Sequence, residues 1–355
     1  MLFRSGFEEG ANANPGREAA LAWARQREAG LCDPGACLEV GAVQAAIEWT
    51  GSGRGGRATL AAATPASTWV VDSTADDPDA AGGDGVCRTA AGVCTLRAAI
   101  TEANAHPGAD LITFRIPGDG PHTIHLTVAL PNLNDLSGGT TIDGYSQPGA
   151  RPNTDASASN ARIMVQVTGP DSLVALSVTS PQNVVRGLAF YGMFRNLSFF
   201  GPAATGNQVQ GCFIGTDAAG SFVAPTKRRD ADGIVLMRGA ARNSIGGTAP
   251  ADRNVVSGNG FHGIATWDEG TDENVIINNL IGLHPDGDQP LPNRAHGVDL
   301  NSGTSYTRIG GERPEERNVI SGNGDGVNII RTVGTVVAGN YIGVAANGTD
   351  AVPNS

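Results

Sequence analysis

In four successive coils of the expected repeat, the Gly that opens a short strand follows an acid or a histidine, in the dipeptides Asp232-Gly, His262-Gly, His296-Gly and Asp325-Gly. If these positions stack in one row, Asp stands beside His twice, and such pairs can transfer protons as general acids and bases. Asp299 would add a further carboxylate next to His296. We favour the alternative, a row of polar turn residues without a chemical role. The sequence suggests no adjacent Arg, Lys or metal that could stabilise a developing charge.

Cation binding is the second chemistry that the residue types allow. One loop rich in Gly and Ala carries the carboxylates of Asp76, Asp77, Asp79 and Asp84. Flexible loops with many carboxylate oxygens suit Ca²⁺. These residues do not have the spacing of an EF-hand, and a solvated acidic loop explains them as well. We therefore predict no cofactor and keep Ca²⁺ at this loop as the alternative.

The chain has five cysteines, and two close pairs among them are spaced for short disulfide loops: Cys32 with Cys37, and Cys87 with Cys94. Neither pair has the spacing or the His partners of a zinc site. Local bridges would imply an oxidising compartment, whereas free thiols would fit a reducing one. We expect Cys212 to be a buried, unpaired thiol.

Composition excludes several classes of protein. The 355 residues carry a formal net charge of −11, which argues against nucleic acid or an anionic membrane as the partner. Apolar residues make up 40% of the chain, enough for a packed core. No run of about 18 apolar residues predicts a transmembrane helix.

The elements that must position the Asp and His residues come from a repeat. The segment Arg253-Asn-Val-Val-Ser-Gly-Asn-Gly recurs 64 residues later as Arg317-Asn-Val-Ile-Ser-Gly-Asn-Gly. Inside it lies a shorter pattern, [Asn/Thr]-x-[Val/Ile]-x-[Gly/Asn], typical of a short strand followed by a bend. Its copies begin at Asn183, Asn207, Asn243, Asn254, Asn274, Thr307, Asn318 and Thr335.

Equivalent residues that return at a fixed period stack in parallel, which predicts a parallel β-helix with three strands in each coil. Neighbouring coils lie ~4.8 Å apart, so stacked asparagine amides would hydrogen-bond one another. We expect one inward, structural column of Asn183, Asn207, Asn243 and Asn274, continued by Thr307 and Thr335. Strand alternation directs Ile234, Leu236, Ile264, Val298, Leu300, Val327 and Ile329 inward, and Val235, Ala265, Asp299 and Asn328 outward.

Three regions follow from this pattern. Residues 1–66 form an unassigned N-terminal segment with a linker, 67–110 an N-terminal cap, and 111–355 the β-helix. The cap holds the Cys87/Cys94 pair and a helix over 95–105, whose apolar face covers the end of the coil. Because 333–355 contains no capping element, we expect the β-helix to continue in a longer protein.

The cap also carries a family motif. Cys94-Thr-Leu-Arg-Ala-Ala resembles the Cys-Ser-Leu-Arg-Glu-Ala motif of bacterial secreted or surface β-helix repeat proteins, with Thr95 in place of the Ser and Ala98 in place of the Glu. Thr140-Thr-Ile-Asp-Gly-Tyr-Ser-Gln-Pro-Gly and the Asn-Val-Ile-Ser-Gly-Asn segment are also similar to that family. The resemblance implies that the all-β solenoid is pectin-lyase-like and right-handed, and the repeat predicts about eight coils. It further implies export and a Cys87–Cys94 bond, but no defined reaction.

Two functions remain open. The first is an exported, non-catalytic β-helix at the cell surface or outside the cell, with repetitive faces that bind a polysaccharide or a surface glycan. The second is a polysaccharide lyase, hydrolase or epimerase that uses the Asp/His row. Because one fold hosts many activities, the fold alone does not decide between them.

Overall fold

The computed structural model describes residues 47–48, 59–60, 67–221 and 230–355. The chain divides into two units, 1–63 and 64–355. The described part of the first unit is an antiparallel pair of short strands, β1 (Ile47–Glu48) and β2 (Thr59–Leu60). The second cysteine pair considered from the sequence, Cys32 and Cys37, lies outside the described residues.

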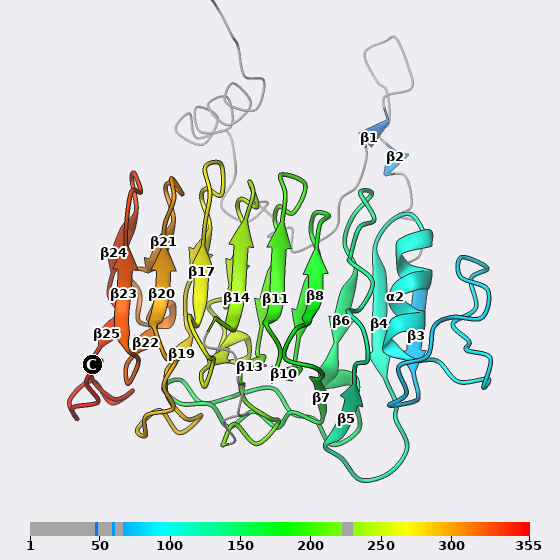
Figure 1. The fold of residues 1–355 in the computed structure, drawn as a ribbon, viewed down its shortest axis with the longest axis horizontal. Helices are drawn as coiled ribbons and strands as arrows, with labels where there is room; N and C mark the ends of the chain where they lie inside the picture. The colour runs from blue at the N-terminus through cyan, green and yellow to red at the C-terminus, as the bar shows by residue number, and fades with distance from the viewer. Residues whose placement is uncertain (1–46, 49–58, 61–66, 222–229) are drawn as a thin grey trace, which may run out of the picture. The chain divides into compact units, whose positions relative to one another are not determined.

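The second unit is a right-handed parallel β-helix built from three sheets (Figure 1). The nine-stranded sheet contains, in spatial order, β3 (Ser67–Val71), β4 (Asp110–Phe114), β6 (Thr141–Asp143), β9 (Val184–Arg186), β12 (Gln208–Gln210), β15 (Ser244–Ile245), β18 (Val275–Ile276), β21 (Arg308–Gly310) and β24 (Val336–Ala338). The eight-stranded sheet contains β5 (His122–His125), β7 (Val165–Thr168), β10 (Ala189–Tyr191), β13 (Phe213–Ile214), β16 (Val255–Val256), β19 (Leu280–Ile281), β22 (Val319–Ile320) and β25 (Tyr341–Ile342). The six-stranded sheet contains β8 (Val174–Val178), β11 (Arg195–Phe200), β14 (Asp232–Met237), β17 (Ile264–Thr266), β20 (His296–Leu300) and β23 (Asp325–Ile329).

All strand pairs within these sheets are parallel, and six successive coils contribute one strand to each sheet. One further coil at each end contributes only two strands, β4 and β5 at the start and β24 and β25 at the end. The β-helix therefore has eight coils, as the repeat predicts. Among the described residues between Asn183 and Asn340 the only helices are the 3₁₀ turns η2 (Pro250–Asp252) and η3 (Pro314–Glu316).

The core fills the inside of the coil. Ile234, Ile264 and Val298 lie in register on adjacent strands of the six-stranded sheet and are fully buried, which confirms the predicted inward face. Val235 and Ala265 belong to neither apolar core cluster, yet they are also fully buried. Strand alternation therefore predicts the direction of a side chain without predicting whether it reaches solvent.

The last coil departs from the inward prediction. Ile329 is exposed, although its register partner Leu300 is fully buried. Val337 and Ile342 show the same contrast with Ile309 and Ile320 on the other two sheets. Each exposed residue occupies a core position with neighbours on one side only.

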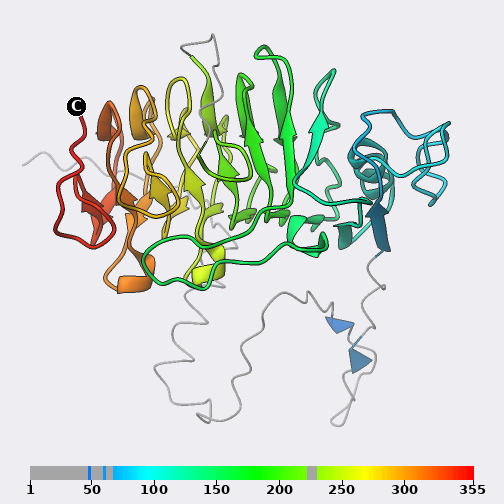
Figure 2. The same ribbon diagram turned by 90° about the horizontal axis from the view of Figure 1, so that it is seen from below.

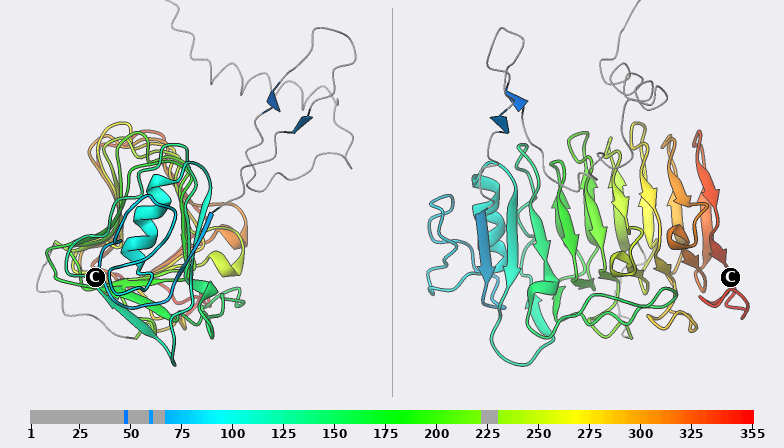
Figure 3. Two further views of the ribbon diagram at one scale, coloured as in Figure 1. Left: turned by 90° about the vertical axis from the view of Figure 1, so that its right-hand side faces the viewer. Right: turned by 180° about the vertical axis from the view of Figure 1, so that it is seen from behind.

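The helix α2 (Leu96–Ala105) covers the N-terminal end of the β-helix. The short 3₁₀ turn η1 (Gly144–Ser146) follows β6. Thr95 caps the helix by accepting the Ala98 N–H, and the helix buries Leu96, Ala99, Ile100 and Ala103 against the first coil. Figure 3 shows α2 lying across the end of the coil, as predicted. No helix among the described residues is long and apolar enough to cross a membrane.

Candidate functional site

The predicted row exists along the six-stranded sheet. Asp232 begins β14, His262 precedes β17, and His296 and Asp325 begin β20 and β23. His296 pairs in register with Asp325, and the backbone of Gly233 bonds the His262 carbonyl. Stacking in parallel therefore brings together four residues that span 94 positions of the sequence.

The row is one residue longer than predicted, because Arg195 begins β11 and pairs in register with Asp232. The Nε atom of Arg195 lies 3.7 Å from Asp232 Oδ2. The expectation that the row has no adjacent Arg is thus wrong. The sequence pattern relied on the Gly that follows each row residue, and Asn196 takes the place of that Gly in β11.

Burial controls the electrostatics of Asp232. The side chain is almost fully buried, and desolvation raises the pKa of Asp232 to about 7. The His262 N–H, which donates to Asp232 Oδ1 at 3.3 Å, and the Arg195 charge oppose this rise in the pKa. The guanidinium of Arg195 also lies over the rings of Phe194 and Trp267, with its Cζ 4.9 and 5.3 Å from their centroids.

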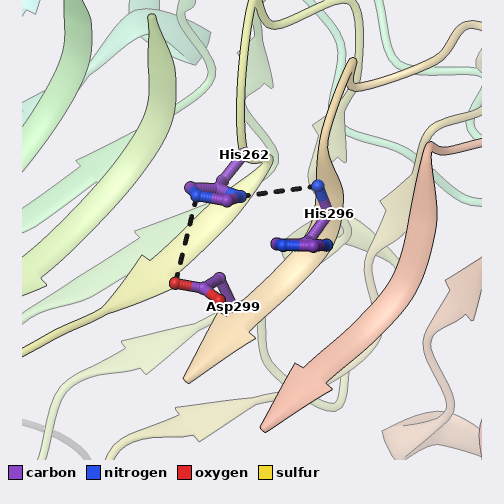
Figure 4. Close-up of side chains that lie close together, drawn as sticks. All are labelled: His262, His296 and Asp299. Atoms are coloured by element: carbon purple, nitrogen blue, oxygen red, sulfur yellow. Dashed lines mark hydrogen bonds and ion pairs between the residues drawn. The ribbon is translucent and has the colours of Figure 1, made fainter. Parts of the chain in front are cut away.

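Asp299 lies next to the row and forms a buried pair with the row residue His262 (Figure 4). His262 Nε2 lies 4.0 Å from Asp299 Oδ2, and its Nδ1 accepts the His296 N–H at 3.4 Å. Asp299 is fixed on both oxygens: Trp267 Nε1 donates to Oδ2 at 2.8 Å and Asn328 Nδ2 to Oδ1 at 2.6 Å. Desolvation lowers the pKa of His262 to about 4, so this ring is neutral at pH 7.

His296 and Asp325 form the accessible pair. His296 Nδ1 lies 2.9 Å from Asp325 Oδ2, and both side chains reach solvent. The two imidazoles stack with centroids 4.8 Å apart and planes 13° from parallel. The exposed ring of Phe261 packs on His262, with 3.9 Å between the ring centroids.

His262, His296 and Asp299 each place one ligand atom within 4.8 Å of the other two, which raises the question of a metal ion. Because His262 Nδ1 accepts a backbone N–H, the neutral ring carries its proton on Nε2, the nitrogen that faces Asp299. A metal-bound histidine keeps its proton on the nitrogen remote from the ion and donates it to an acceptor. The arrangement fits a neutral His262 that faces the Asp299 carboxylate better than metal coordination.

The acidic loop near the cap is more structured than predicted. Asp76 is bound by Arg97 at 2.7 Å, and the Asp77 carbonyl accepts the Thr95 hydroxyl. Asp79 and Asp84 lie with Glu102, which the sequence pattern missed because it comes from α2. The Glu102 carboxylate already accepts two backbone N–H groups, from Gly83 and Gly85. Ca²⁺ binding at this loop stays a prediction.

The asparagines form the predicted inward column. Asn183, Asn207, Asn243 and Asn274 are buried, and each amide donates to the Oδ1 of the next at 2.9–3.2 Å. Thr307 continues the column as a buried residue, and Thr335 follows it in register. The structure contains two further asparagine ladders that the sequence analysis did not predict as columns. One runs through Asn254, Asn279, Asn318 and Asn340. The other runs through Asn196, Asn259, Asn293, Asn323 and Asn354.

Cys87 and Cys94 are bonded, with their Cα atoms 5.1 Å apart. Cys212 is a buried free thiol, and burial raises its pKa to about 12. Its backbone N–H donates to Asn254 Oδ1, so it stands at the start of the second ladder. Neither cysteine environment is that of a reactive thiolate.

Comparisons with known proteins add no assignment. No protein-family model matches the chain, and a search of curated proteins finds no significant match.

Proposed function

We propose that this protein is an exported β-helix repeat protein of the bacterial secreted or surface type, and that it binds a polysaccharide without cleaving it. The motif beginning at Cys94, the Cys87–Cys94 bond and the parallel β-helix support this assignment. A disulfide is compatible with export, because such bonds persist in oxidising compartments.

The binding face is the outer side of the six-stranded sheet around β17, β20 and β23. Phe261 offers an exposed ring, and His296 and Asp325 offer accessible hydrogen-bonding groups beside it. An aromatic surface next to polar groups suits a sugar ring, which has apolar faces and hydroxyl edges. The net charge of −11 favours a neutral polysaccharide over a polyanionic one.

The burial of the acid–base groups carries the non-catalytic part of the proposal. Asp232, His262 and Asp299 are all nearly inaccessible, and each is held by neighbours within the sheet. A general acid or base must come within hydrogen-bond reach of its substrate. These three side chains are therefore assigned to holding the face together.

A panel of neutral and acidic polysaccharides tests binding, for example by affinity electrophoresis with the full chain. Phe261→Ala combined with His296→Ala should abolish retardation by the bound polysaccharide. Gln208→Ala, on the outer side of the nine-stranded sheet, is the matched control and should bind as the parent does. Retardation that survives the double substitution would place binding elsewhere.

The alternative is a polysaccharide lyase, hydrolase or epimerase, and Arg195 beside Asp232 is the observation that favours it. A carboxyl group with a pKa of about 7 can act as an acid near neutral pH, and a cation beside it can stabilise charge. New reducing ends or unsaturated products, measured on the same panel with and without Ca²⁺, would reveal such activity. If turnover appears and His262→Ala or His296→Ala removes it while the fold persists, the non-catalytic proposal is wrong.

A further inference from the structure

A long connection between β6 and β7 lies along the outside of later coils (Figure 2). Residues 151–162 of this connection, here called the strap, are closed at the base by the bridge between Arg151 and Arg162. The strap is fixed to distant turns, because Asn153 Nδ2 donates to the Pro250 carbonyl and Ser159 N–H donates to the Pro285 carbonyl.

The strap satisfies a buried arginine. Arg253, which follows η2, is 5% exposed, and no carboxylate in the described part of the chain is bonded to it. Its Nε and Nη2 donate to Asn278 Oδ1 at 2.9 and 2.6 Å. Each of its two terminal nitrogens also donates to one backbone carbonyl of the strap: Nη1 to Ala158 O at 2.9 Å and Nη2 to Ala156 O at 2.8 Å.

The repeat provides a second copy of this position without a strap. Arg317 follows η3 as Arg253 follows η2, 64 residues earlier. Its Nε donates to the Gly339 carbonyl at 2.9 Å, and Gly339 holds the place that Asn278 holds in the first copy. Its guanidinium lies 4.2 Å over the ring of Tyr341. Among the described residues, no acceptor meets the terminal nitrogens of Arg317.

A cavity of about 300 Å³ lies beside this arginine. Its lining includes Arg317, Tyr341 and Glu315 together with Arg253 and the strap residue Ser157. The cavity thus lies between the end of the strap and the turn that the strap does not reach. Its volume is at the lower end of the range for small-molecule sites.

We propose that this cavity binds a small organic carboxylate, such as the acid group of a sugar acid, on the open fork of Arg317. The ligand oxygens take the place that the two strap carbonyls take at Arg253. A planar carboxylate suits a guanidinium because each of its two oxygens can accept from one terminal nitrogen. The site is separate from the face around His296, and this inference does not rest on the proposed function.

Isothermal titration of the full chain with sodium glucuronate, sodium acetate and glucose tests the site. Glucuronate should bind, glucose should not, and acetate should bind if the carboxylate alone is recognised. Arg317→Ala should weaken glucuronate binding about tenfold or more, since it removes charge-assisted hydrogen bonds. Arg317→Lys should also weaken it, because Lys keeps the charge but loses the fork.

Arg294→Ala, at an exposed arginine away from the cavity, is the matched control and should bind as the parent does. Ala346→Phe fills the cavity and leaves Arg317 in place, so it should block binding even if Arg317→Ala fails to fold. The inference is overturned if glucuronate and acetate do not bind, if glucose binds as tightly as glucuronate, or if folded Arg317→Ala retains parental affinity.

Discussion

The imidazole rings of His262 and His296 stack almost parallel, with their centroids 4.8 Å apart. One ring is buried and the other reaches solvent. Burial is the main cause that lowers the pKa of His262, and the neighbouring His296 lowers it further. The outer face of the sheet therefore contains a histidine that stays neutral where an ordinary one would be charged.

This pKa makes the stability of the protein depend on pH. Unfolded histidine binds its proton near pH 6.5, whereas His262 binds it only near pH 4 in the fold. Between these values the unfolded state holds more protons, so the contribution of His262 to stability rises with pH from about 4 to 6.5 and is lost as the pH falls. The stability of the parent relative to His262→Gln should change by up to about 3 kcal/mol across this window.

Urea unfolding at several pH values measures the free energy of unfolding of parent and variant. Asp232, whose pKa is raised, makes stability fall as the pH rises, and this contribution cancels when the variant is subtracted from the parent. His125→Gln, at an exposed histidine, should follow the parent profile. A His262→Gln profile that runs parallel to the parent would contradict the assignment.

The first asparagine ladder should be sensitive to a single break. Asn243 Oδ1 accepts from both the backbone N–H and the amide of Asn207, at 3.0 and 2.9 Å. Asn243→Ala leaves both buried donors without a partner, which should cost about 2–4 kcal/mol. Urea denaturation checks this, and Asn134→Ala, at an exposed asparagine, should change stability by less than about 0.5 kcal/mol. Equal effects of the two changes would refute a structural ladder.

The capping helix should be essential for the first coil. Ile100 is fully buried in the core beneath α2, so Ile100→Asp introduces an unpaired buried charge and should cost several kcal/mol. Ala105→Asp, at the exposed end of the same helix, should cost less than about 1 kcal/mol. Thermal unfolding followed by circular dichroism separates the two, and an unchanged melting temperature for Ile100→Asp would contradict the capping role.

The same substitution at Leu300 and at Ile329, which are register partners, compares the stability contribution of a covered and an uncovered core position. They pair on adjacent strands, but Leu300 is 0% exposed and Ile329 is 44% exposed. Leu300→Asp should destabilise the protein by about 3 kcal/mol or more, while Ile329→Asp should cost about 1 kcal/mol or less. Comparable losses in denaturant unfolding would mean that the last coil is covered in solution.

Much of this molecule could be predicted from its sequence because the repeat fixes the register. Once Asn243 and Asn274 are recognised as equivalent, the parallel stack, the inward face and the Asp232–His262 alignment follow from strand geometry. The capping helix and the Cys87–Cys94 pair follow from local pattern and from the family motif. These features depend on short-range order or on exact periodicity.

Features that break the period were decided only in three dimensions. Arg195 joins the row although Asn196, and not a Gly, follows it in β11. Glu102 meets Asp79 and Asp84 from a helix. The strap crosses several coils to reach Arg253, so no spacing in the sequence announces that contact.

The sequence by itself determined which residues stack, because parallel coils place equivalent positions side by side. Only the tertiary structure decided their chemistry. Burial, which depends on all surrounding atoms, holds His262 neutral and raises the pKa of Asp232. The same dependence separates Arg253, enclosed by the strap, from Arg317, which has the same local sequence and remains open.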